Sequence, residues 1–229
     1  SENIFLSVTN DEFIKVVFPA LPKQAFAAIC TKLGNPNEGG YNAQRADQAA
    51  ANLALTANNY VNCSSFYHGD NGSFRALKGK FAACHFLMLD DLGTKVDLDR
   101  FEDFDLSWLL ETSPGNHQAG IIFDKPIIEG AEAERLLNTL IDANLCDAGA
   151  KQPLTRWARL PVAINGKPEH QTESGAPFQC RLIHWRPDCR YSPEAIVEEL
   201  HLELAPAGRP KKTKVSGKSL IIRSADEGL

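Results

Sequence analysis

The sequence has no apolar run that approaches the roughly 20 residues of a membrane-spanning helix, which excludes an integral membrane protein. Its first residues, Ser1, Glu2, Asn3 and Ile4, contain no basic segment and no small-residue cleavage site, so no signal peptide is visible. We therefore expect a cytoplasmic protein that has no membrane partner.

Cysteine pairs with the Cys-x-x-Cys spacing of zinc and redox sites are also absent. The six cysteines are scattered, at Cys30, Cys63, Cys84, Cys146, Cys180 and Cys189. Without a secretory signal, this pattern is typical of reduced thiols that pack as small hydrophobic side chains.

An excess of positive charge is missing, because 24 Lys and Arg residues stand against 29 Asp and Glu residues, for a formal net charge of −5. A uniformly basic protein that coats duplex DNA is thereby excluded. Nucleic acid is not excluded as a partner, since an acidic metal site can lie beside a local basic groove. With 229 residues, 43% of them hydrophobic, the chain has material for a sizeable core in one large domain or two small ones.

Hydrophobic periodicity and turn residues divide the chain into helices and strands. We predict a helical N-terminal part over about residues 1–60, with helices at 11–18, 22–33 and 43–60. Strands are predicted at 61–67, 81–89 and 178–185, a hairpin at 106–112 and 117–123, and helices at 128–145 and 192–204. The pattern indicates the α/β class with a mixed, largely antiparallel sheet.

The last 25 residues differ in composition from the rest of the chain. Residues 205–225 contain six basic residues and no acid, together with Pro206, Gly208 and Pro210. We therefore predict one domain over residues 1–204 and a basic tail or linker over residues 205–229.

Two adjacent acids, Asp90 and Asp91, follow the continuous apolar run 81–89 (FAACHFLML). Such a run suits a strand that is buried on both faces. Carboxylates at its end reach an edge of the sheet, where open α/β sheets bind ligands. Because adjacent carboxylates repel each other, a hard cation such as Mg²⁺ or Mn²⁺ would stabilise them. A helix cap or a solvated turn is the alternative interpretation.

His117 and Asp147 are further candidates. His117 follows the turn Ser113-Pro114-Gly115-Asn116 and opens a predicted strand, so its ring is placed to donate to a phosphate oxygen. Asp147 follows a predicted helix, where the negative end of the helix dipole disfavours an acid unless a cation binds. A packing histidine and a surface acid are the alternatives.

The segment 155–167 concentrates cations beside turns. It contains Arg156, Arg159 and Lys167, together with Trp157 and Asn165. Arginine and lysine at this density suit a triphosphate or a nucleic-acid backbone. An ordinary basic loop is the alternative.

In this order, the segments LMLDDLGTKV, ETSPGNHQAG, CDAG and ARLPVAINGKP resemble the motifs of the primase-polymerase (archaeo-eukaryotic primase) superfamily. Within it, the chain is most similar to RepB-type plasmid primases and related phage primase-polymerases. The resemblance covers about residues 41–204, and ETSPGNHQ is its most specific piece. It implies a two-lobed primase-like core with the active site in the cleft between the lobes.

The resemblance also implies roles for the candidates. Asp90, Asp91 and Asp147 would hold the catalytic Mg²⁺ or Mn²⁺ ions, and His117 would contact the nucleotide phosphates. Arg156, Arg159, Asn165 and Lys167 would lie near triphosphate or template. Two departures exist: Ser113 lies four residues before His117, and the Asp147 match needs an alignment gap, with Asp142 as the substitute.

The function implied is a metal-dependent DNA primase and DNA polymerase that synthesises primers on single-stranded DNA in plasmid or phage replication. Its substrates would be dNTPs or NTPs, its partner a helicase domain or protein, and Trp157, Trp185 or Tyr191 would stack on template bases. A non-catalytic single-stranded DNA origin-binding replication initiator is the alternative. A nuclease or relaxase is less well supported, because none of the six histidines forms a His-x-His pair.

Overall fold

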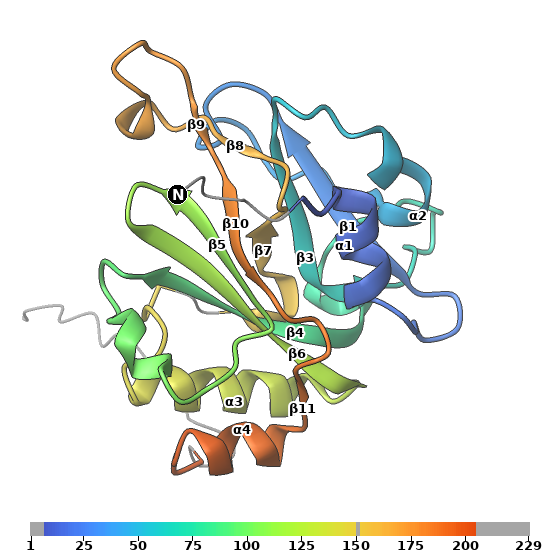
Figure 1. Ribbon diagram of the computed structural model, residues 1–229. Helices are drawn as coiled ribbons and strands as arrows, with labels where there is room; N and C mark the ends of the chain where they lie inside the picture. The colour runs from blue at the N-terminus through green and yellow to red at the C-terminus, as the bar shows by residue number, and fades with distance from the viewer. Residues whose placement is uncertain (1–6, 150–151, 205–229) are drawn as a thin grey trace, which may run out of the picture.

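The computed structural model describes residues 7–149 and 152–204, and its centre is a nine-stranded sheet with the order β10-β5-β6-β4-β3-β1-β2 (Figure 1). In addition, β11 pairs with β6, and β7 pairs with β3. The strands of this sheet are β1 (Phe26–Lys32), β2 (Gln44–Arg45), β3 (Asn58–Phe66), β4 (Phe81–Leu92), β5 (Trp108–Ser113), β6 (Asn116–Ile127), β7 (Trp157–Arg159), β10 (Arg181–Trp185) and β11 (Arg190–Tyr191). A second sheet pairs β8 (Ile164–Asn165) with β9 (Phe178–Gln179). Among the named strands described, β11 with β6 is the one parallel pair, which confirms a mixed, largely antiparallel sheet.

The sheet divides into two lobes at the contact between β3 and β4. These strands pair only from Phe66 opposite Phe81 to Ser64 opposite Cys84. Beyond that point β4 continues beside β6, whereas β3 pairs with β7, with Tyr60 opposite Arg159. One lobe therefore contains β1, β2, β3 and β7, and the other contains β4, β5, β6 and β10, as the family resemblance implied.

Helices cover the lobes from outside. The structure contains α1 (Asn10–Val17), α2 (Ala46–Ala49), α3 (Gly130–Asp142) and α4 (Pro193–Glu199), with 3₁₀ turns η1 (Ala50–Asn52), η2 (Lys78–Lys80), η3 (Leu98–Phe101), η4 (Pro153–Thr155) and η5 (Pro168–His170). Helix α3 lies along β4 and β6, with α4 beyond it (Figure 1). It buries Leu136, Leu137 and Leu140, which share one face at helical spacing. None of the helices in the described ranges is both long enough and apolar enough to cross a membrane.

The predicted helical N-terminal part is wrong except for α1. The helix expected at 22–33 is strand β1, and the helix expected at 43–60 is reduced to α2 and η1 before β3 begins. Tertiary pairing explains both errors, because β1 forms ladders with β2 and β3 on its two edges. The side chains of Asn58 and Asn59 also bind backbone carbonyls of Lys32 and Ala54, which holds the start of β3 extended.

The other predicted elements are present with changed ends. Strand β4 is buried on both faces from Ala82 to Leu89, as the apolar run predicted, but it extends to Leu92. The hairpin is formed by β5 and β6, and the strand predicted at 178–185 divides into β9 and β10. Ser192 caps α4, whose last residue is Glu199 rather than 204. The predicted tail at 205–229 lies outside the described residues.

Candidate active site

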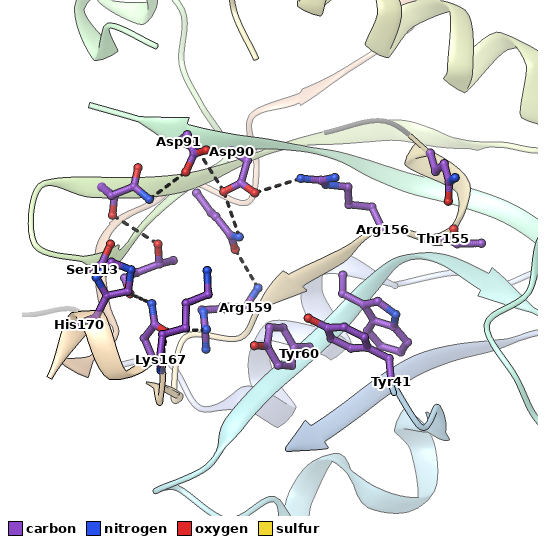
Figure 2. Close-up of a pocket in the computed structure, with 16 residues that line it drawn as sticks. Tyr41, Tyr60, Asp90, Asp91, Ser113, Thr155, Arg156, Arg159, Lys167 and His170 are labelled. Atoms are coloured by element: carbon purple, nitrogen blue, oxygen red, sulfur yellow. Dashed lines mark hydrogen bonds and ion pairs between the residues drawn. The ribbon is translucent and has the colours of Figure 1, made fainter. Parts of the chain in front are cut away.

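A pocket of about 420 Å³ lies at the opening between the two lobes (Figure 2). It brings together six of the eight residues that the sequence analysis selected: Asp90, Asp91, Arg156, Arg159, Asn165 and Lys167. Figure 2 shows the two carboxylates on one wall, with Tyr41 and Tyr60 across from them and Lys167 and His170 to one side. The segments that form this site are far apart in the sequence and meet only through the divergence of β3 and β4.

A β-bulge directs both carboxylates into the pocket. Leu89 lies opposite Ala119 and Leu92 lies opposite His117, so β4 has one residue more than β6 over this interval. Asp91 has φ 59°, in the left-handed region that non-glycine residues rarely adopt. Consecutive side chains of a regular strand point to opposite faces, whereas here two neighbouring acids line one pocket.

Several contacts hold Asp91 in this strained conformation. Its carbonyl accepts from the backbone N–H groups of Lys95 and Val96 at 3.0 and 3.1 Å. The turn then packs on the β5–β6 hairpin at Gly93, where a Cβ would lie 2.5 Å from the carbonyl oxygen of Gly115. Gly93 also has φ 87°, so a side chain there is disfavoured twice. Strain that its surroundings enforce in this way is typical of functional sites.

The side chain of Asp91 is held in its ionised form. Oδ2 lies 2.7 Å from the ammonium of Lys95, and Oδ1 accepts from Asn116 Nδ2 at 3.1 Å. Partial burial by itself disfavours the charged carboxylate, but the hydrogen bonds from Lys95 and Asn116 outweigh burial and keep the pKa of Asp91 below its usual range. The carboxylate is therefore available to bind a cation at neutral pH.

Asp90 is anchored by residues from two other strands or their flanks. Its Oδ2 forms an ion pair with Arg156 Nη2 at 3.0 Å, and its Oδ1 accepts from Gln118 Nε2 at 3.2 Å. The carboxamide oxygen of Gln118 accepts in turn from the backbone N–H of Arg159 at 2.9 Å. Gln118 thus links β4, β6 and β7 beneath the pocket.

Sequence reasoning missed Gln118 and selected its neighbour His117. Asn116 and Gln118 line the pocket, whereas His117 does not. The His117 ring nitrogen Nδ1 instead lies 3.2 Å from the carbonyl oxygen of Leu92. The two-residue period of a strand supplied the missing signal, because it places 116 and 118 on one face and 117 on the other.

Asp147 lies beside the pocket but not in its wall. Its Oδ2 is 3.5 Å from Lys95 Nζ, so Asp91 and Asp147 contact the same ammonium. Its proposed substitute, Asp142, is the exposed last residue of α3 and also lies outside the pocket wall. Among the described residues, the structure therefore brings only Asp90 and Asp91 together in the pocket as acids.

Arg159 and Asn165 form a buried network behind the pocket. Arg159 is 4% exposed and donates to Asn58 Oδ1 at 3.1 Å, to the Ile164 carbonyl at 2.6 Å and to Asn165 Oδ1 at 2.9 Å. Asn165 donates across the lobes to the Thr112 carbonyl at 2.7 Å. These contacts use most of the guanidinium donors, so Arg159 shapes the pocket wall and adds positive charge to it.

Lys167 is the cation that is most available to a ligand. It is half-buried and lines the pocket, and no salt bridge within residues 7–149 and 152–204 involves its ammonium. His170 lies near it on the same side of the pocket (Figure 2). An ammonium in this position is suited to an anionic group that enters the pocket.

The donor set fits a hard divalent cation that shares its coordination with a substrate. Among the described residues, no group of three or more His, Cys, Asp or Glu side chains has the arrangement of a complete metal site. Mg²⁺ nevertheless is commonly bound through one or two carboxylates, with water and substrate phosphates completing its shell. Asp90 and Asp91 meet that description, whereas residues 7–149 and 152–204 contain no site of three convergent carboxylates.

Comparison with known proteins gives the same family that the motifs suggested. Residues 33–205 match the family described as RepB DNA-primase N-terminal domain. Among curated protein sequences, none matches the chain.

Three solved structures share the fold, each with a TM-score of 0.54. The AEP domain of the cyanophage S-2L primase-polymerase is 12% identical, over 82% of this chain and 94% of that one. The catalytic domain of primase RepB′ in complex with initiator DNA is 17% identical, over 85% and 94% of the two chains. A further structure of primase RepB′ is 17% identical, over 84% of this chain and 62% of that one.

Proposed function

Because the chain belongs to the RepB DNA-primase N-terminal domain family, we propose that it is a metal-dependent nucleotidyltransferase that synthesises primers on single-stranded DNA. One observation carries this proposal: the β4 bulge places Asp90 and Asp91 in the same pocket as Arg156 and Lys167. An acidic pair with cations beside it in a pocket of about 420 Å³ matches the charge pattern of a nucleoside triphosphate with its metal ion.

Nucleotidyl transfer makes a specific electrostatic demand on such a pocket. Negative charge develops on the attacking oxygen, on the α-phosphate and on the leaving pyrophosphate, so the protein mainly positions groups and stabilises charge. A Mg²⁺ or Mn²⁺ ion held by Asp90 and Asp91 would supply a Lewis acid for the reacting phosphate.

The remaining pocket residues have separate tasks in this proposal. Lys167 binds the β- and γ-phosphates, because its ammonium faces the pocket without an ion-pair partner in the described chain. Arg156 holds Asp90 in place and adds charge on the same wall. Gln118 orients Asp90 through its bond to the β7 backbone. Asp147 and His117 act on the site from outside its wall, through Lys95 and through the Leu92 carbonyl.

We further propose that this activity serves plasmid or phage replication, since the structural relatives include a phage primase-polymerase and a primase bound to initiator DNA. A helicase, as a further domain or a separate protein, would supply the single-stranded template.

The decisive experiment is unprimed synthesis on single-stranded DNA with all eight nucleotides and either Mg²⁺ or Mn²⁺. We expect labelled oligonucleotides from the wild type and at least an approximately 100-fold loss in Asp90→Asn and Asp91→Asn, since each replaces a charged metal ligand with a neutral amide. Asp124→Asn, an exposed β6 acid outside the pocket, is the matched control and is expected to retain full synthesis.

Two outcomes would contradict the proposal. Full synthesis by both pocket variants would remove Asp90 and Asp91 from the metal site. Absence of both unprimed synthesis and primer extension, with single-stranded DNA binding intact, would favour the non-catalytic replication initiator.

A further inference from the structure

Tyr41 and Trp157 form a stacked aromatic pair on the pocket wall. Their ring centroids are 5.6 Å apart and their planes are inclined by 13°. Tyr60 meets Tyr41 edge-on, with centroids 5.2 Å apart. Tyr41 comes from the segment between β1 and β2, and Trp157 is the first residue of β7. Two segments of the same lobe therefore meet at the pocket through their rings.

Tyr41 is the most exposed tryptophan or tyrosine among the ring pairs of the described residues. Tyr41 is 46% exposed and Trp157 is half-buried. Trp185, which is also half-buried, packs on Phe13, and Tyr191 is buried against Phe104. Of the three aromatic residues expected to stack on bases, only Trp157 lines the pocket.

The pair is held in place from below by a buried cation. Lys32 is 8% exposed, and its ammonium lies 4.5 Å from the centroid of the Tyr41 ring. The same ammonium donates to the carbonyl oxygens of Pro36 and Gly39, which fixes the segment leading to Tyr41. Fixing the ring in advance lowers the ordering cost that a ligand would otherwise have to offset.

The chemistry of this wall selects a particular kind of ligand. An exposed, preorganised aromatic surface favours a flat ring that stacks, whereas the cations of the same pocket favour phosphates. A molecule with both groups, a flat base joined to phosphate, is a nucleotide unit. A purely aliphatic or purely anionic ligand would use only half of the pocket.

We propose that Tyr41 and Trp157 form a stacking platform for one unpaired nucleobase, on the wall that faces Asp90 and Asp91. This proposal deepens the proposed function and rests on it, because it assigns the base of a nucleotide unit to a subsite of the same pocket. The base belongs either to the single-stranded template or to the incoming nucleotide, and the two sources share the same stacking chemistry.

The test measures binding without synthesis. The full chain, without divalent metal, is titrated with a short oligo(dT), with an abasic oligonucleotide of the same length, and with free dTTP. Tryptophan fluorescence is measured in a Trp185→Phe background so that it reports on Trp157, since Trp185 is half-buried, as Trp157 is, and Trp108 is 1% exposed. We expect oligo(dT) or dTTP to quench the fluorescence and the abasic strand to leave it unchanged.

The variants isolate the stacking contribution. Affinities of the variants are measured by fluorescence anisotropy of labelled strands and by calorimetry for dTTP, because neither method needs Trp157. Tyr41→Ala and Trp157→Leu are expected to weaken binding of the base-containing ligand by about 5- to 100-fold, while their affinity for the abasic strand stays at the wild-type value. Tyr41→Phe keeps the ring and is expected to keep the affinity. Tyr67→Ala is the matched control, because Tyr67 is 39% exposed and lies outside the pocket.

The choice of ligand distinguishes a template base from the base of the incoming nucleotide. Comparison with the synthesis assay distinguishes the stacking platform from the proposed enzymatic function. A loss with oligo(dT) alone assigns the platform to the template, and a loss with dTTP assigns it to the incoming nucleotide. Wild-type affinity of both Tyr41→Ala and Trp157→Leu for base-containing ligands would overturn the platform. If base-dependent binding is present but no synthesis occurs, the platform stands and the proposed enzymatic function fails.

Discussion

Arg156 Nη2 lies 3.0 Å from Asp90 Oδ2, although the two residues are 66 positions apart in the sequence. Both side chains are largely buried, with 20% and 23% of their surface exposed. Arg156 immediately precedes β7 in one lobe, and Asp90 lies on β4 in the other. The pair therefore connects the lobes at the pocket and determines where the Asp90 carboxylate points.

Substitutions of Gln118 and of its neighbour His117 test which of the two residues supports the pocket. We expect Gln118→Leu to reduce synthesis by about 10- to 100-fold, because Asp90 loses a positioning contact. His117→Ala is expected to change both the rate of synthesis and the nucleotide KM less than Gln118→Leu does, because His117 does not line the pocket. Steady-state kinetics of both variants, with circular dichroism to verify folding, checks this order. A larger KM change in His117→Ala would restore the phosphate contact predicted from the sequence.

Lys167→Ala should weaken nucleotide binding with little effect on the free energy of unfolding. We expect the nucleotide KM to rise by about tenfold, because a charge-assisted contact to phosphate is lost. The free energy of unfolding should change by no more than about 0.5 kcal/mol, since no ion pair in the described chain depends on Lys167. Lys167→Arg keeps the charge and is expected to keep most of the affinity. An unchanged KM in Lys167→Ala would exclude a phosphate contact.

Arg159→Lys should act mainly on stability. A lysine ammonium cannot reach Asn58, Ile164 and Asn165 together, so buried acceptors lose their donors. We expect the free energy of unfolding to fall by about 3 kcal/mol, measured by urea denaturation. Arg186→Lys is the control, because Arg186 is exposed and its ion pair with Asp105 contributes little. Equal effects of the two substitutions would show that the buried network is not the cause.

His85 should make the protein sensitive to acid. It is 2% exposed, and burial lowers its pKa to about 3. The unfolded chain takes up a proton at His85 below its ordinary pKa of about 6.5, whereas the folded protein does not. Between about pH 6.5 and pH 3, the free energy of unfolding should therefore fall as the pH falls, by about 1.4 kcal/mol per pH unit. Above about pH 7, His85 is neutral in both states and contributes no pH dependence.

The measurement is urea denaturation at a series of pH values. His85→Phe keeps a ring beside Phe18 and should make the free energy of unfolding less dependent on pH in this range. It also loses the hydrogen bond to Ser65, which should lower the free energy of unfolding equally at every pH. His201→Ala, at an exposed position, should leave the slope unchanged. A wild-type slope in His85→Phe would assign the acid sensitivity to other groups.

The N-terminal region shows where local patterns mislead. The segment 26–32 has an apolar run that suits a buried helix and a buried strand equally well, and residues 43–60 are rich in alanine. Pairing with β2 and β3 makes the first segment a strand. Hydrogen bonds from Asn58 and Asn59 to distant carbonyls, including that of Val162, hold the second in an extended form. Neither influence can be seen in a short window of sequence.

Local sequence patterns were enough to predict the α/β class, the buried strand β4, the β5–β6 hairpin and the acids that follow the apolar run, because each depends on residues close together in the chain. Three features of the site come from the folded arrangement alone. The bulge turns Asp90 and Asp91 into one pocket, Gln118 rather than His117 lines that pocket, and Arg159 is buried whereas Lys167 is only half-buried. Those choices depend on the register of β4 against β6 and on the separation of β4 from β3. Both are set by packing between segments that are distant in the sequence, which local patterns do not record.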